Sequence, residues 1–228
     1  MSVARSSAAV KSPNASSAVR QQRHEPHNSL DDFPTPPWAT RAVCEELMVK
    51  GWITPDMICR EPAANRGHMV RPLVEYFGGV EASDIRDYGA GFRQADYLFG
   101  PEPDAVDWTI TNPPFRLAEQ FIARALATSS VGVAMIVRSA FLEGGGRYKS
   151  LFAVTPPTVI LQFAERVVMH RGKLAPKGSS PTAYSWLIWL VRTSEIGTLF
   201  DWIAPCRAAL ERDGDYPADG IARVGGAA

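Results

Sequence analysis

Short apolar runs alternate with helical stretches from about residue 31 to residue 212. The runs are rich in β-branched and aromatic residues, which predicts strands over 57–60, 80–84, 107–111, 131–137, 158–163 and 184–191. Apolar residues at helical spacing predict helices over 38–48, 68–77, 117–127 and 197–210. Strands that alternate with helices are typical of a three-layer α/β domain, in which ligands bind beyond the carboxyl ends of the strands.

The strand predicted over 107–111 runs directly into Asn112-Pro113-Pro114-Phe115. Proline has no N–H and its ring fixes the backbone, so the two prolines end the sheet ladder and leave nearby carbonyls free to accept hydrogen bonds. Acceptors at Asn112 and Pro113 would hold the hydrogens of an exocyclic amine, while Phe115 stacks on its ring. The plainer alternative is a strand-end turn with two chance prolines.

The turn after the first predicted strand, Glu61 to Gly67, begins with an acid and continues with small residues. Small residues allow a ligand to approach the backbone closely, as glycine-rich turns do in nucleotide-binding sheets. Asn65 stands where a first glycine would be expected. Asparagine is the residue after glycine that best tolerates a left-handed backbone, so the turn remains feasible. An ordinary strand-to-helix turn is the alternative.

Taken in their linear order from Phe33 to Phe115, these segments resemble the S-adenosylmethionine-dependent amino-methyltransferases, which carry an Asn/Asp-Pro-Pro-Tyr/Phe motif. The chain is most similar to the DNA N6-adenine branch. The resemblance implies the Rossmann-like class I methyltransferase fold, a mostly parallel seven-stranded sheet with helices on both faces. It also implies S-adenosyl-L-methionine as cofactor and methyl transfer to the N6 amine of adenine in DNA. The implied catalytic residues are Asn112, Pro113, Pro114 and Phe115.

The resemblance implies a cofactor site formed by Thr35, Pro36, Glu61, Pro62, Ala63, Asn65, Gly67, Asp84, Ile85, Asp96, Tyr97 and Asn112. Glu61 would accept from the cofactor ammonium, and Asp84, at the end of the second strand, would take both ribose hydroxyls. Asp96 would lie near the adenine amino group, in a slot walled by Ile85 and Tyr97. For Asp84 and Asp96 the alternative is an exposed surface acid.

Any nucleic-acid contact is expected to be local, because 24 Lys and Arg balance 24 Asp and Glu. Residues 139–180 are the candidate target-recognition loops of the domain. The candidate contacts on and beside these loops are Arg138, Ser139, Arg147, Lys149, Arg171, Lys173 and Lys177. A solvated basic surface without a nucleic-acid role is the alternative.

The remaining chain suggests one domain, over 31–212, between a disordered basic Ser/Ala-rich tail (1–30) and a flexible C-terminal tail (213–228). Its three cysteines, Cys44, Cys59 and Cys206, show no paired spacing, so neither a metal site nor a disulfide is expected. No apolar run approaches the roughly 20 residues of a membrane span. We therefore expect a soluble, cytoplasmic protein from a prokaryotic or phage setting. Its oligomeric state is left open, a dimer included.

Two further functions fit the same residues. The acceptor geometry at Asn112 suits any planar amine, so an RNA base amine or a protein glutamine amide is an alternative substrate. The departure at Asn65 also suits an inactive cofactor-binding module associated with nucleic acid.

Overall fold

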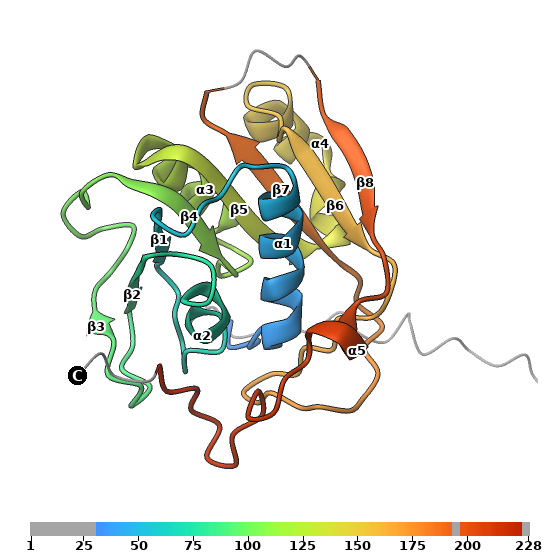
Figure 1. The fold of residues 1–228 in the computed structure, drawn as a ribbon. Coiled ribbons are helices and arrows are strands. Elements are labelled where there is room, and N and C mark those ends of the chain that lie inside the picture. Colours follow the sequence, from blue (N-terminus) through green and yellow to red (C-terminus); the bar gives the residue numbers. More distant parts are fainter. Residues whose placement is uncertain (1–30, 193–196, 225–228) are drawn as a thin grey trace, which may run out of the picture.

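The computed structural model describes residues 31–192 and 197–224. Residues 1–30, predicted as a basic tail, lie outside the described residues, as do 225–228 of the predicted C-terminal tail. The described chain forms one mixed sheet flanked by helices (Figure 1). No described helix has the length and apolar character needed to cross a bilayer.

The sheet has eight strands in the order β3-β2-β1-β4-β5-β7-β6-β8. Their bounds are β1 Ile58–Glu61, β2 Gly79–Asp84, β3 Arg93–Gln94, β4 Val106–Thr111, β5 Ser129–Arg138, β6 Val159–Phe163, β7 Tyr184–Leu190 and β8 Leu199–Ile203. Only β7 is antiparallel to its neighbours, β5 and β6, and every other pair is parallel. The predicted mostly parallel α/β sheet is confirmed, with eight strands instead of seven.

The prediction of a helix over 197–210 is wrong for its first part. Leu199–Ile203 forms β8, which pairs in parallel with β6 at the edge of the sheet. Bulky apolar and aromatic residues favour an extended edge strand here, and Pro205 disfavours a helix that runs through it. Only Arg207–Leu210 is helical, as α5.

The other helices are α1 Pro37–Val49, α2 Val70–Leu73, α3 Ala118–Ala127 and α4 Gly145–Arg147, with a 3-10 turn over Ser139–Leu142 and a π turn over Tyr148–Phe152. α1 begins with proline in its first turn, as the sequence predicts. α2 is shorter than the predicted 68–77. Tight turns follow it up to Phe77, because the chain must reverse at Gly78 to enter β2.

Helices cover both faces of the sheet, with α1 and α2 on one and α3 on the other (Figure 1). Both faces of β5 are buried. Ala134 and Ile136 belong to the apolar layer under α1, while Val133, Met135 and Val137 belong to the layer under α3. A strand buried on both faces reads as a continuous apolar run, which is the pattern seen in the sequence.

The predicted flexible tail from residue 213 differs from the structure, which packs residues 213–224 against the domain. Asp215 is only 1% exposed and bonds to Arg41 on α1, 174 positions earlier in the chain. Small and charged residues after the last helix favour a frayed end. The sequence does not show that Asp215 has a buried partner far away in the chain. The cysteines are free, and Cys44 and Cys59 are buried.

Candidate active site

A cavity of about 190 Å³ lies beyond the carboxyl ends of β1, β2 and β4. This is the position where ligands bind in open α/β sheets. Nine residues predicted to hold a cofactor line it: Thr35, Pro62, Ala63, Asn65, Asp84, Ile85, Asp96, Tyr97 and Asn112. Pro36, Glu61 and Gly67, which were also predicted, do not line the cavity but belong to the segments that form its wall.

Glu61 ends β1 and is fully buried. Its Oε1 accepts hydrogen bonds from the Ala63 N–H at 2.9 Å and the Thr111 hydroxyl at 2.5 Å. Its Oε2 has no hydrogen-bond partner within the described chain. Burial raises the pKa of Glu61 to about 8, against the two hydrogen bonds, which lower it. A buried carboxylate oxygen without a partner is costly, so this atom is suited to receive a ligand's donor.

Substituting Glu61 by Gln tests this burial in the ligand-free protein. An acid whose pKa is raised from 4.5 to about 8 adds stability below pH 4.5 and loses it as the pH rises through 8. We expect Glu61→Gln to keep the Oε1 contacts and to leave its buried amide hydrogens without an acceptor at both pH values, so that its free energy of unfolding relative to wild type is higher at pH 9 than at pH 4 by on the order of 4 kcal/mol. Urea unfolding at both pH values measures this, and equal differences from wild type at both would contradict it.

Asn65 adopts φ 49°, the left-handed conformation that the sequence analysis anticipates for this turn. Its backbone N–H donates to Asp84 Oδ2 at 2.9 Å, and its side-chain amide donates to Asp32 Oδ1 at 2.8 Å. The asparagine side chain therefore ties the turn to the segment before α1, which glycine could not do. Gly67 lies close to Ala222 and Phe92 instead of near the cavity.

Asp84 ends β2 and lines the cavity beside Asn65. Each carboxylate oxygen accepts one backbone N–H, Oδ2 from Asn65 and Oδ1 from Arg86, both at 2.9 Å. Burial raises the pKa of Asp84. A carboxylate oxygen can accept more than one hydrogen bond, so both atoms retain capacity for hydroxyl donors of a ligand.

Asp96 and Tyr97 reach the cavity in different ways. Asp96 Oδ1 accepts from the backbone N–H groups of Leu98 and Phe99, each at 3.0 Å, which fixes the turn at this wall. The Tyr97 ring packs against Phe121 with centroids 5.1 Å apart and is mostly buried. More exposed apolar walls come from Ile85 and Phe99.

Asn112 lies at the end of β4, where it lines the cavity. Its side-chain Nδ2 donates to the Phe33 carbonyl at 2.8 Å and to Thr35 Oγ1 at 3.0 Å. These two acceptors engage both amide hydrogens and so set the orientation of the group, with Oδ1 as the remaining acceptor. The structure thereby brings the predicted Thr35 and Asn112 into direct contact.

A second cavity, of about 640 Å³, shares Asp31 and Phe33 with the first. Phe115 lines this second cavity, and its backbone N–H donates to Asp31 Oδ2 at 2.8 Å. The Arg138 guanidinium lies 4.0 Å from the centroid of the Phe115 ring and 5.4 Å from that of Phe33. One predicted catalytic residue, Phe115, and one predicted nucleic-acid residue, Arg138, therefore meet here, with a cation over one aromatic face.

The other predicted nucleic-acid residues separate into three groups. Arg171 lines the second cavity with Arg138. Lys149, Lys173 and Lys177 are exposed. Ser139 and Arg147 are held internally, since the Ser139 hydroxyl bonds to Gln162 and Ser185 and the Arg147 guanidinium donates to two backbone carbonyls. The internal contacts of these two residues stabilise the fold around the site.

Several cavity residues were not identified from the sequence. They include Asp31, Phe33, His68, Met69, Tyr88 and Phe99. Tyr88, an aromatic residue shortly after the strand predicted over 80–84, was one available signal. His68 carries no such signal, because it enters the wall only through the fold of the turn that precedes α2.

No protein-family model matches the chain, and no curated protein matches its sequence. Solved structures do resemble it. One described as a class I S-adenosylmethionine-dependent methyltransferase from Listeria monocytogenes has a TM-score of 0.58 and 15% identity, covering 79% of this chain and 68% of that one. A type I restriction-modification methyltransferase subunit from Streptococcus thermophilus has a TM-score of 0.55 and 9% identity, covering 75% and 48%.

A structure from Pyrococcus horikoshii described as an RNA methyltransferase has a TM-score of 0.51 and 15% identity, covering 72% of this chain and 90% of that one. The chain spans about half of the Streptococcus subunit. Sequence identities this low support a shared fold and nothing more. The chain has the class I methyltransferase fold, with an eighth strand at the edge of its sheet.

Proposed function

We propose that the protein is an S-adenosylmethionine-dependent methyltransferase that modifies the exocyclic N6 amine of adenine in DNA. The observation that carries the proposal is the fixed amide of Asn112, whose Nδ2 hydrogens are bonded to Phe33 and Thr35. Its Oδ1 therefore remains available as a hydrogen-bond acceptor beside the first cavity. The second cavity, which Phe115 lines, adjoins the first. A cofactor and a base would occupy these two adjoining spaces.

The residues of the first cavity fit S-adenosyl-L-methionine. Glu61 lies behind the cavity lining, where its unpartnered Oε2 suits the ammonium group, and the carboxylate of Asp84 on the lining suits the ribose hydroxyls. Ile85 and Phe99 offer apolar surface for the adenine ring. A bound ammonium would also favour the ionised form of Glu61, and thereby remove the cost of its burial.

S-adenosylmethionine supplies an electrophilic methyl group on its sulfonium sulfur. Asn112 Oδ1 and the Pro113 carbonyl would accept the two hydrogens of the substrate amine and direct its lone pair at that methyl. When bound, the sulfonium would give up its methyl to the amine nitrogen, and the amine would release a proton to water. Most of the rate enhancement on this mechanism comes from positioning.

The second cavity supports a nucleic-acid substrate. Arg138 and Arg171 bring cationic side chains to its wall, beside the rings of Phe33 and Phe115. A flipped base needs an aromatic surface to stack on, and its flanking phosphates need cations. Segments within 139–180 supply part of this wall, which supports their assignment as target-recognition loops.

Transfer of labelled methyl from S-adenosylmethionine tests the proposal. Purified protein is offered double-stranded DNA, single-stranded DNA, RNA and a glutamine-containing protein in parallel. We expect label in DNA, recovered as N6-methyladenine after digestion. Label only in RNA or protein would refute the DNA assignment, while cofactor binding without any transfer would favour the inactive module.

Arg138→Ala tests the role of the second cavity. We expect weaker DNA binding, by about tenfold at low salt, and a salt dependence of binding that is reduced by about one phosphate contact. Lys149→Ala is the matched control, because Lys149 is exposed and does not line this cavity. Equal losses in both variants would indicate a general electrostatic effect instead of a specific contact.

A further inference from the structure

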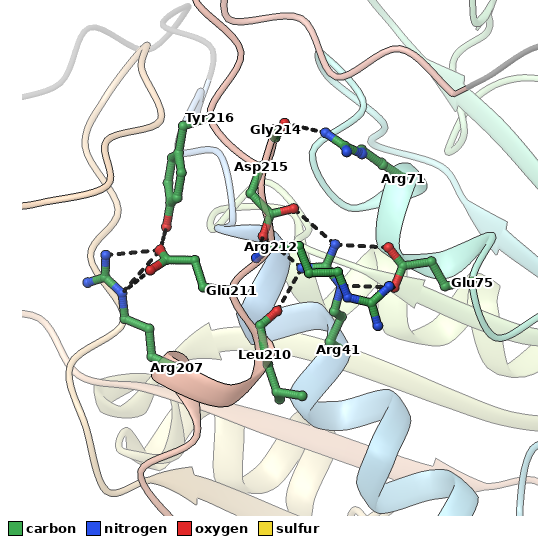
Figure 2. A network of polar contacts seen from close by, with 10 residues as sticks. All are labelled: Arg41, Arg71, Glu75, Arg207, Leu210, Glu211, Arg212, Gly214, Asp215 and Tyr216. Atoms are coloured by element: carbon green, nitrogen blue, oxygen red, sulfur yellow. Dashed lines mark hydrogen bonds and ion pairs between the residues drawn. The ribbon is translucent and has the colours of Figure 1, made fainter.

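The segment Glu211–Val224, here called the C-terminal strap, runs from α5 past the ends of α1 and α2 toward the turn that follows β1 (Figure 1). Its anchor is Asp215, which accepts two hydrogen bonds from Arg41 at 2.7 and 2.9 Å (Figure 2). Both side chains are completely buried. Glu75 binds the same guanidinium from the other side and also pairs with Arg212 of the strap at 2.8 Å. Arg71 of α2 donates to the Gly214 carbonyl, so the strap is tied to both helices (Figure 2).

Beyond this anchor the strap reaches the turn that follows β1. The Ala222 N–H donates to the Arg66 carbonyl at 2.8 Å, and Ala222 is only 1% exposed. Gly67 has φ 86°, and a Cβ there would lie 2.4 Å from the Ala222 carbonyl oxygen. Gly67 of the predicted cofactor turn therefore leaves space for the strap. The sequence had predicted that this space would hold the cofactor.

His68 extends the contact to the cavity itself. His68 is only 3% exposed, lines the first cavity and lies beside the backbone of Gly220. On its inner side the turn is held by the bond from the Asn65 N–H to Asp84. The cavity wall over 62–68 is therefore fixed from two sides, by the end of β2 and by the strap.

We propose that residues 220–222 of the strap are positioning residues that hold the turn over 62–68 in the conformation that binds the cofactor. This inference rests on the proposed function. None of the three residues lines the cavity, so the effect on affinity would pass through Arg66, Gly67 and His68. Fixing a binding loop in advance raises affinity, because less ordering remains to be done on binding.

Ala222→Pro in the full chain tests the proposal, since proline removes the N–H that bonds to Arg66. We expect the dissociation constant for S-adenosylhomocysteine, measured by calorimetry, to rise about tenfold. The KM for S-adenosylmethionine should rise with it, while kcat stays within a factor of about two. Ala218→Pro is the matched control, because Ala218 is exposed and occupies the second position of a turn closed by Gly220 N–H and Pro217 carbonyl, where proline is favoured.

An unchanged dissociation constant in a folded Ala222→Pro protein would overturn the strap's role and leave the proposed function intact. If the wild-type protein binds no S-adenosylhomocysteine, the proposed function itself fails. Hydrogen exchange of the wild-type protein gives a second measurement that needs no variant. We expect slower exchange at the Ala222 and Gly67 amides when S-adenosylhomocysteine is bound, and unchanged exchange at both would also overturn the inference.

Discussion

Replacing Asn112 by Ala is expected to lower the rate of methyl transfer by roughly 10²–10³-fold, the usual cost of removing one preorganised group that stabilises developing charge. The variant loses Oδ1, the proposed acceptor for the substrate amine. It also loses the two hydrogen bonds from Nδ2 to Phe33 and Thr35. Single-turnover transfer to an adenine-containing duplex measures the rate, and calorimetry with S-adenosylhomocysteine measures cofactor affinity, which we expect to be largely retained.

Thr35→Val separates the two roles of the Asn112 amide. It removes the hydroxyl that accepts from Nδ2 at 3.0 Å but leaves Oδ1 in place. We expect this control to retain most of the transfer rate. A loss in Thr35→Val as large as that in Asn112→Ala would mean that Asn112 acts only by anchoring the segment before α1. Unaltered transfer in Asn112→Ala would exclude catalysis at this site.

Replacing Asp215 by Ala is expected to destabilise the protein by about 3 kcal/mol, which corresponds to a fall of roughly 6–12 °C in unfolding temperature for a domain of this size. The substitution removes one of two carboxylates from the fully buried Arg41 guanidinium. The remaining partner, Glu75, is itself partly exposed and shared with Arg212. Urea unfolding at pH 7 gives the change in the free energy of unfolding.

Asp219→Ala is the matched control, from the same strap and the same residue type. Asp219 pairs with Arg223 at 2.6 Å, but both side chains are largely exposed. Exposed pairs contribute between zero and about 1 kcal/mol, so we expect little change in unfolding temperature. If both variants unfold alike, the Arg41–Asp215 pair does not anchor the strap.

The central strands and the proline-terminated end of β4 followed from local sequence patterns. The continuous apolar run of β5 and the prolines after β4 leave few local alternatives, because both act on the backbone within a few residues. The left-handed Asn65 was anticipated for the same reason, since the tolerance of asparagine for positive φ is a property of the residue itself. The edge strand β8 was not anticipated, because a five-residue segment such as Leu199–Ile203 extends only where a neighbouring strand offers hydrogen bonds.

The sequence by itself determined the α/β alternation, the ends of the central strands and nine of the residues that line the first cavity, because periodicity, prolines and strand-end acids act through nearby backbone. Tertiary structure alone decided the rest: that Arg138 covers Phe115, that Gly67 accommodates Ala222, and that Asp215 is buried against Arg41. Each of these contacts joins residues more than 20 positions apart. Their energy depends on burial and on the partner's geometry, and neither exists until the chain has folded.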